Sequence, residues 1–370
     1  IKYISLPKRY GLARYPEIHV IDMGSEKEDS GKFGTVFSGL LQDKIEERLL
    51  KKEQVIILHN RRGYSPVIKC LDCGDISMCP QCKVFLTYHN QGAKVICHFC
   101  GHSVIKKLDQ CLQCGSDKIL YSGTGTQRVE ELLVEMFPKA KIERLDMDTG
   151  KKGAVISKIL KQFSDGNIDI LLGTQMIAKG LDFPNATLVG IINADIGLHL
   201  PDFRSSERIF QLIYQASGRA GRKDKLGEVV LQTYMPENPV IKFVSELDIK
   251  NFYKSTLSER KELNYPPYSW LAKIEFSGKD FNKTEEITNS FSSSIFGQYK
   301  GLDILGPAPC YLEKLKNRYR FQIIFKSNKI IDPNGFLLHK FIIDNIKKLK
   351  TDIGSTGYKA KIFFDPLSLI

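Results

Sequence analysis

Short apolar runs alternate with amphipathic stretches over the first 240 residues of the chain. Apolar residues recur at helical spacing at positions 129, 132, 133 and 136, and again at 156, 159, 160 and 163. A third helix is predicted from Ser205 to Ser217. The order of strands and helices indicates βαβ units, and therefore a doubly wound α/β fold with a parallel sheet. The predicted strands are Val55 to His59, Lys141 to Asp146, Asp169 to Thr174, Ala186 to Asn193 and Gly227 to Thr233.

The pattern changes after residue 234. Prolines at 236 and 239 end the α/β region, a helix is predicted near residues 242 to 263, and the segment Tyr265-Pro266-Pro267 breaks the chain again. Beyond it the order is strand, helix, two strands, helix and strand, which suggests a C-terminal α+β sandwich domain with an antiparallel sheet. We therefore expect a connector at 1–22, an α/β lobe at 23–240 with an insertion at 65–120, a linking helix at 241–263 and a tail domain at 264–370.

Eight of the nine cysteines lie within 45 residues as four C-x-x-C pairs. Two residues between thiolates allow both sulfurs to bind one metal ion, and four sulfurs complete a tetrahedral zinc site, so eight ligands predict two Zn²⁺ ions. Disulfides are disfavoured in a reducing compartment, and four adjacent copies argue against a redox motif. The predicted ligands are Cys70, Cys73, Cys79, Cys82, Cys97, Cys100, Cys111 and Cys114.

Four pairs can form two sites in three ways, and the spacing favours a nested arrangement. Cys79/Cys82 and Cys97/Cys100 would flank a hairpin, and Cys70/Cys73 would join Cys111/Cys114 at its base. Glycines follow the second cysteine of three pairs, where positive φ lets backbone N–H groups turn toward sulfur. Aromatic residues in the insertion could stack on bases, but small zinc modules also need aromatic filler, and filler is the simpler interpretation.

The formal net charge of +12 suggests a polyanionic partner, although a lysine-rich composition from an AT-rich genome explains it equally well. Residues 301–370 hold 12 Lys and Arg against 6 Asp and Glu. No run of 18 apolar residues and no secretory leader are present, so we expect no membrane contact and a cytoplasmic, nucleoid-associated protein. The chain starts at Ile1 with a polar, proline-interrupted stretch, which we interpret as the remnant of a longer protein.

Polar motifs follow the predicted strands, where ligands gather in sheets of this kind. Residues 215–222 read QASGRAGR, with two arginines three positions apart and glycines that permit close approach. Two such guanidinium groups can donate hydrogen bonds to a phosphoryl group that is bound by another part of the molecule. The alternative is that the arginines are simply basic residues at a helix C-terminus, where the helix dipole favours positive charge. Residues 173–183 read GTQMIAKGLDF, in which Thr174, Gln175 and Lys179 can hold a strand backbone while Asp182 reaches toward a nucleotide.

These two segments resemble motifs V and VI of superfamily 2 helicases. With HNRRGY at 59–64, GTGTQR at 123–128, PDFRSSER at 201–208 and the cysteine insertion, the chain closely resembles the PriA family (primosomal protein N′) over nearly all 370 residues. A RecA-like second helicase lobe is then implied. So are ATP-driven 3′→5′ DNA unwinding, recognition of stalled forks or D-loops, and loading of the replicative helicase with other primosome proteins and single-strand DNA-binding protein. The implied site residues are Arg219, Arg222 and Gln215 for catalysis, Gly180, Asp182, Gly218 and Arg222 for nucleotide binding, and Arg61, Arg62, Thr174, Gln175 and Lys179 for DNA binding.

The sequence departs from a complete helicase in one respect. It has no G-x-x-x-x-G-K-[ST] loop and no D-E-x-H segment, so the phosphate cradle and the Mg²⁺ carboxylate would belong to a first lobe outside this chain. We therefore expect this chain to bind ATP and Mg²⁺ only together with that lobe, and to be inactive alone. The alternative is a non-catalytic, zinc-stabilised DNA-binding scaffold for primosome assembly. Walker motifs upstream in the reading frame would exclude it.

The third strand of the tail suggests a DNA-binding face. Tyr319, Phe321, Ile323 and Phe325 alternate with polar and basic residues, so one face would be apolar and the other basic. We expect the basic face to be exposed and to hold single-stranded DNA, so that losing its charges would barely change stability. A solvated sheet face without a ligand is the alternative. The predicted contacts are Arg318, Arg320 and Lys326, with Lys314 and Lys316 extending the charge.

Overall fold

The structure is a computed structural model of the 370-residue chain. Its described residues fall into two compact units, one within 1–66, 122–199 and 206–252 and the other within 67–121, 200–205 and 253–370. Each unit is described by itself. The described residues are 15–26, 36–59, 67–70, 72–73, 79–80, 86–89, 94–96, 102–104, 110–111, 113–122, 126–145, 153–174, 183–198, 202–218, 226–299, 301–353 and 357–370.

The first unit is built on a six-stranded sheet in the order β1-β11-β10-β2-β9-β8. Every neighbouring pair runs parallel, and the four inner strands are almost wholly buried and rich in Val, Ile and Leu, as a sheet covered on both faces requires. The five predicted strands and the α/β fold class are confirmed. The strands are β1 (Glu17–Asp22), β2 (Gln54–His59), β8 (Ile142–Leu145), β9 (Ile170–Gly173), β10 (Ala186–Ile192) and β11 (Glu228–Thr233).

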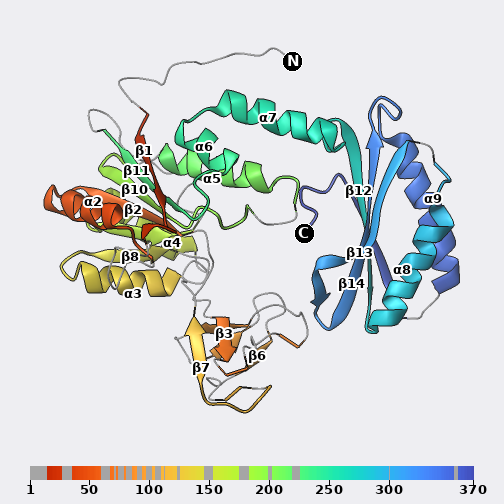
Figure 1. The fold of residues 1–370 in the computed structure, drawn as a ribbon, viewed down its shortest axis with the longest axis horizontal. Coiled ribbons are helices and arrows are strands. Elements are labelled where there is room, and N and C mark those ends of the chain that lie inside the picture. The colour runs from red at the N-terminus through yellow and green to blue at the C-terminus, as the bar shows by residue number, and fades with distance from the viewer. Residues whose placement is uncertain are drawn as a thin grey trace. The chain divides into compact units, whose positions relative to one another are not determined.

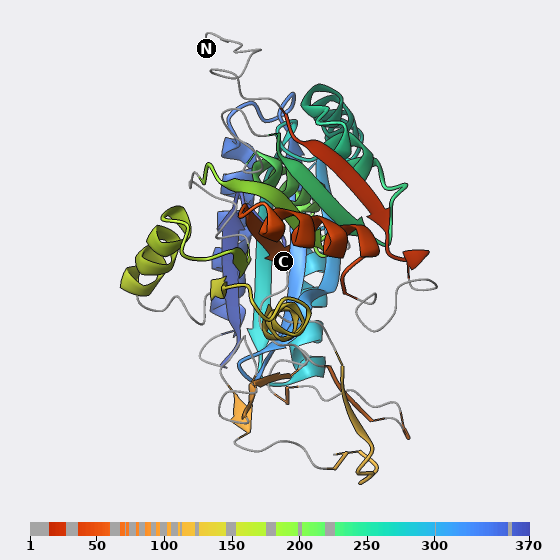
Figure 2. The same cartoon turned by 90° about the vertical axis from the view of Figure 1, so that its left-hand side faces the viewer.

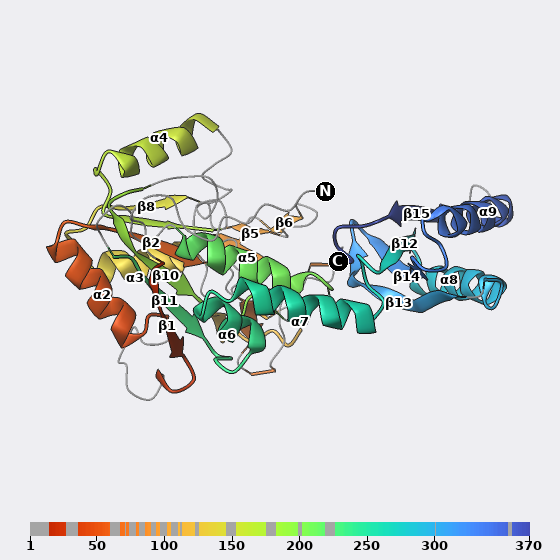
Figure 3. The same cartoon turned by 90° about the horizontal axis from the view of Figure 1, so that it is seen from above.

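Helices cover both faces of this sheet (Figure 3). On one face α2 (Gly39–Leu50) and α3 (Thr126–Met136) bury Leu41, Ile45 and Leu133 against alternate residues of the strands. The other face is covered by α4 (Gly153–Ser164), α5 (Ser205–Ser217) and α6 (Pro239–Ser245). The three helices predicted from apolar spacing are therefore present, and α5 has the predicted bounds.

Residues 17–22, which we had placed in a connector, form β1 instead. This strand lies at the edge of the sheet and pairs with β11 from Glu17↔Glu228 to Asp22↔Thr233 (Figure 2). An edge strand is only half covered, so the sequence EIHVID keeps polar residues and lacks the continuous apolar run of the inner strands.

The predicted linking helix is divided into two helices, α6 and α7 (Ile249–Glu262). Leu247 adopts a positive φ of 54° between them, and the Asp248 carboxylate accepts the Asn251 N–H at 3.0 Å.

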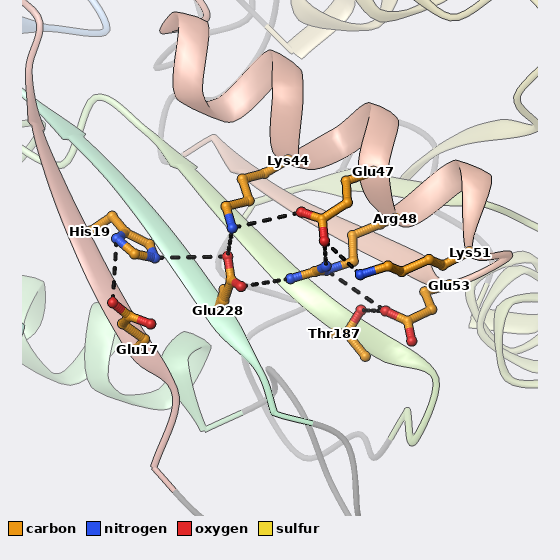
Figure 4. A network of polar contacts seen from close by, with 9 residues as sticks. All are labelled: Glu17, His19, Lys44, Glu47, Arg48, Lys51, Glu53, Thr187 and Glu228. Atoms are coloured by element: carbon orange, nitrogen blue, oxygen red, sulfur yellow. Dashed lines mark hydrogen bonds and ion pairs between the residues drawn. The ribbon is translucent and has the colours of Figure 1, made fainter.

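A polar network ties α2 to the sheet at the amino ends of the strands (Figure 4). Glu228, the first residue of β11, lies 2.9 Å from the Arg48 guanidinium and 2.8 Å from the Lys44 ammonium. Burial alone would raise the pKa of Glu228, but the hydrogen bond from Lys44 and the charge of Arg48 hold it below its usual value. Because ligands of such sheets bind at the opposite, carboxyl ends, we assign this network to stability.

Replacing Glu228 with glutamine should therefore lower the free energy of unfolding by roughly 2–3 kcal/mol at pH 7, because the buried Arg48 loses the nearest of its three carboxylate partners and Lys44 loses its charged partner as well. The folded-state pKa is depressed, so the contribution is present above the unfolded pKa and is lost as the pH falls through the folded one. Urea unfolding of the two proteins at pH 7 and pH 4 tests this. An equal difference at both pH values would contradict it.

The cysteine insertion forms two small sheets. Strands β3 (Val67–Cys70) and β7 (Ile119–Ser122) pair at its two ends, so they bring the entering and leaving chain together. Between them β4 (Thr87–His89), β5 (Lys94–Ile96) and β6 (Ser103–Val104) form an antiparallel meander, in which Val95 is fully buried. The insertion therefore returns close to its starting point, as a segment inserted between two elements of the α/β lobe must.

The tail domain is a four-stranded antiparallel sheet in the order β13-β14-β12-β15, with two helices packed on one face (Figure 1). Ala272, Ile274, Phe276, Ile323 and Phe325 form the core beneath the helices. The predicted α+β order is confirmed, and β13 continues through two prolines, which an edge strand tolerates. The elements are β12 (Ser269–Gly278), α8 (Phe281–Ile295), β13 (Leu302–Leu315), β14 (Arg318–Asn328), α9 (Phe336–Ile353) and β15 (Lys359–Phe364). Among the described residues, no helix combines the length and hydrophobicity that a membrane span requires.

Candidate zinc centre and α/β-lobe site

Four cysteines from the two ends of the insertion meet at one point. Cys70 ends β3, Cys73 follows it, and Cys111 and Cys114 precede β7. Their sulfur atoms all lie within 4.8 Å of one another, with Cys70 to Cys114 and Cys73 to Cys111 each at 3.6 Å. A zinc tetrahedron with Zn–S bonds of about 2.3 Å has sulfur–sulfur edges of about 3.8 Å. The four thiols therefore fit a tetrahedral zinc ion, in the combination that the nested pairing predicts.

Backbone groups around this centre favour thiolates. The pKa of Cys70 is lowered to about 7, chiefly by the Cys73 backbone N–H, and the Gln113 N–H lies 3.4 Å from the Cys111 sulfur. Gly115 has φ of 75°, the positive value expected after a C-x-x-C pair. The two pairs are also joined through side chains, because Asp72 accepts hydrogen bonds from Ser116 at 2.8 Å and Lys118 at 3.2 Å.

The second predicted zinc site lies mostly outside the described residues. Cys79 is described and is 1% exposed, whereas Cys82, Cys97 and Cys100 are not described. A second quartet of these cysteines therefore remains a prediction. The ninth cysteine, Cys310, is buried in the tail domain, and burial raises its pKa to about 11, so its thiol is protonated and unreactive at neutral pH.

Of the two polar motifs, residues 173–183 begin where β9 ends, whereas residues 215–222 begin in the last turn of α5. Thr174 directly follows β9 and is buried, while α5 ends at Ser217 with Gln215 exposed in its last turn. The Gly218 N–H still bonds to the Tyr214 carbonyl at 3.1 Å, so the helical geometry extends to the residue before Arg219. The following predicted site residues lie outside the described residues: Arg61, Arg62, Gln175, Lys179, Gly180, Asp182, Arg219 and Arg222.

Asp195 is a residue of this edge that the sequence analysis did not single out. It follows β10, is 7% exposed, and accepts hydrogen bonds from the Thr233 hydroxyl and, at 2.7 Å, from the Tyr234 N–H. It thereby joins the ends of the neighbouring strands β10 and β11. The signal that could have found it is an acidic residue three positions after a largely apolar strand, because a charge survives burial there only with donors around it.

The three cations predicted to bind DNA are not the exposed charges that we expected. Arg320 is 14% exposed and forms a two-pronged bond to Glu275, at 2.9 and 2.6 Å. Arg318 donates to the carbonyls of Ser277 and Gly357, and Lys326 donates to the Leu263 carbonyl at 2.7 Å. The expectation that their loss would barely change stability is therefore wrong, because each is engaged by the protein itself. Their contact with DNA stays a prediction.

Replacing Arg320 with alanine should lower the free energy of unfolding of the tail domain by about 3 kcal/mol, because Glu275, 8% exposed, keeps its charge without a partner. Replacing Lys361, an exposed cation on the same face, should change it by less than about 0.5 kcal/mol. Urea unfolding followed by circular dichroism distinguishes them. Equal effects of the two substitutions would show that the Arg320–Glu275 pair contributes nothing.

Three family models match successive parts of the chain. The PriA DNA helicase Cys-rich region matches residues 79–104, the helicase conserved C-terminal domain matches residues 103–224, and the primosomal protein N C-terminal domain matches residues 261–356. Two of these three models are specific to one family, and they lie on either side of the helicase match. The chain belongs to the PriA family.

Curated PriA proteins align with almost the whole chain. The replication restart protein PriA of Bacillus subtilis is 40% identical over 93% of this chain and 42% of its own length. The PriA protein of Synechocystis is 36% identical over 99% of this chain and 43% of its own length. The PriA protein of Rickettsia felis is 37% identical over 96% of this chain and 54% of its own length. The chain thus spans about half the length of the curated relatives that it matches. The PriA match agrees with a helicase lobe that carries a cysteine-rich insertion and is followed by a separate tail.

Proposed function

We propose that this chain supplies the second motor lobe, the zinc module and the DNA-binding tail of an ATP-dependent DNA helicase that restarts replication. The observation that carries the proposal is the position of α5. This helix packs on a parallel sheet and is followed directly in the sequence by the two-arginine segment 219–222, while one PriA-specific domain is inserted in the lobe and another follows it. A helicase motor built from two such lobes closes around ATP between them, so one lobe would provide the arginines.

The chemistry assigned to this chain is stabilisation of charge on a transferring phosphoryl group. Arg219 and Arg222 would donate to the terminal phosphate of ATP, Gly218 would permit the close approach, and Gln215 would orient the attacking water. Gly180 and Asp182 would lie on the nucleotide side of the same edge. ATP with Mg²⁺ supplies the free energy of translocation. The Walker loop that holds it would come from a first lobe.

The remaining residues of this edge would grip the DNA strand. Thr174, Gln175 and Lys179 follow β9, and Arg61 and Arg62 follow β2, the neighbouring strand in the sheet. Hydrogen-bond donors that follow two neighbouring β-strands could bind the phosphate backbone of a single DNA strand that passes over this edge of the sheet. We further propose 3′→5′ movement, preference for stalled forks or D-loops, action at the nucleoid, and loading of the replicative helicase with single-strand DNA-binding protein and other primosome proteins.

Unwinding of a labelled fork tests the proposal. A full-length protein containing this chain should separate a duplex that carries a 3′ single-stranded tail when ATP and Mg²⁺ are present, and should leave a duplex with a 5′ tail intact. Binding of both forks without strand separation would instead favour a scaffold that assembles the primosome without motor activity. Separation of the 5′-tailed duplex alone would overturn the proposed direction.

A further inference from the structure

The face of the tail sheet opposite α8 and α9 is strongly basic. Residues paired directly across antiparallel strands share a face, and Ser277 of β12 pairs with Arg320 of β14 on one side and Lys359 of β15 on the other. Glu275 likewise pairs with Lys361. Three carboxylates, Glu275, Asp303 and Glu313, oppose six cations on this face: Lys273, Arg318, Arg320, Lys326, Lys359 and Lys361.

Four of these cations are engaged within the domain. Beyond the contacts of Arg318, Arg320 and Lys326 described above, Lys273 is 5% exposed and donates to the Leu369 carbonyl at 3.0 Å. Lys359 and Lys361 differ, since both side chains are exposed and neither has an acidic or carbonyl partner in the described part of the chain. The inner cations therefore set a positive potential, and the two lysines of β15 are available to a ligand.

Phe363 continues the same row. Residues 359, 361 and 363 are the exposed ones along β15, in strict alternation with half-buried core residues. The Phe363 ring is 38% exposed, and the Lys273 ammonium lies 5.4 Å from its centroid. Exposed lysines on an edge strand also discourage pairing with other strands, which explains the charges without a ligand. That explanation does not account for an exposed aromatic ring beside them.

We propose that Lys359, Lys361 and Phe363, the β15 stripe, form the contact of the tail domain with single-stranded DNA. Two residues along a strand separate the lysines by about 7 Å, close to the spacing of successive phosphates in an extended single strand. Each ammonium would bind one phosphate and the Phe363 ring would stack on a base, a combination that recognises single strands without regard to sequence. The inference rests on the proposed function, in which the tail binds DNA.

Binding of the 370-residue chain to a labelled oligothymidine tests the stripe. The variant K359A/K361A should bind about tenfold more weakly near 0.1 M salt, and its slope of log K against log salt should be shallower by about 1.4 units, or 0.7 per lost phosphate contact. The matched control is K340A/K347A, which removes the same charge from exposed positions on α9. This control should bind as the parent chain does, with an unchanged slope.

The aromatic contact needs a separate readout. Phe363→Ala should weaken binding about tenfold, in the range of one lost base stack, while Phe363→Trp should retain it. The chain has one tryptophan, so the emission added by Phe363→Trp can be followed against the parent, and stacking should quench it. If the parent binds DNA and K359A/K361A matches the α9 control, the stripe is wrong and the proposed function stands. If the parent does not bind at all, the DNA-binding role of the tail fails with it.

Discussion

Replacing Arg219 or Arg222 with alanine in a protein that contains both motor lobes should lower DNA-stimulated ATP turnover about 10³-fold or more. The expected loss is that of an arginine that stabilises charge on a transferring phosphoryl group, acting from the opposite side of the nucleotide. DNA affinity should change little, because neither arginine is assigned to a strand contact. Steady-state phosphate release with saturating single-stranded DNA measures the loss.

Two further variants test whether the loss of turnover comes from the arginine side chains themselves. Arg222→Lys keeps the charge but not the planar fork of donors, so it should recover little of the activity. Lys161→Ala removes an exposed charge from α4, outside every motif, and should leave turnover within about twofold of the parent. Normal turnover in both arginine variants would mean that segment 215–222 is an ordinary basic helix end.

Metal analysis of freshly reduced protein should find two zinc ions for each chain. Cys70→Ser and Cys97→Ser should each release one ion, because they belong to different quartets in the nested arrangement. Zinc binding contributes roughly 10 kcal/mol or more to the folding of small modules, so in each variant the part of the insertion around the lost ion should lose its structure. Most helical circular dichroism should remain, because the flanking sheet has apolar cores of its own.

Cys310→Ser is the control for the zinc experiment. Cys310 is buried in the tail domain and belongs to neither quartet, so two zinc ions should remain bound after its replacement. One ion or none in the parent protein would refute the two-site arrangement. Loss of both ions from Cys70→Ser alone would show that the two sites fold as one unit.

The features that the sequence predicted well are those determined by local pattern. Buried parallel strands such as β9 and β10 are continuous apolar runs, and two C-x-x-C pairs that enclose two others leave few ways to form zinc sites. The helix Ser205–Ser217 shows its period over thirteen residues, with turn-forming residues at either end. In each case the pattern of neighbouring residues is enough to predict the structure.

The features that it missed depend on distant pairing. Alternation along β14 placed Arg320 on the correct face of the sheet but could not show that Glu275, 45 residues earlier, would bind it. Glu275 reaches Arg320 because of the register between β12 and β14, and this register cannot be read from the alternation of residues within either strand. β1 was missed for a similar reason, because its place beside β11 is set by residues more than 200 positions away.

The most direct test of the account is ATP hydrolysis by the 370-residue chain, measured alone and after it is joined to the first lobe of a PriA protein. In the proposed function this chain supplies only the arginines of the ATP-hydrolysis site, and the first lobe supplies the loop that holds ATP. The account therefore predicts no DNA-stimulated hydrolysis by the isolated chain and hydrolysis after the first lobe is restored. Sustained DNA-stimulated hydrolysis by the isolated, pure chain would contradict it.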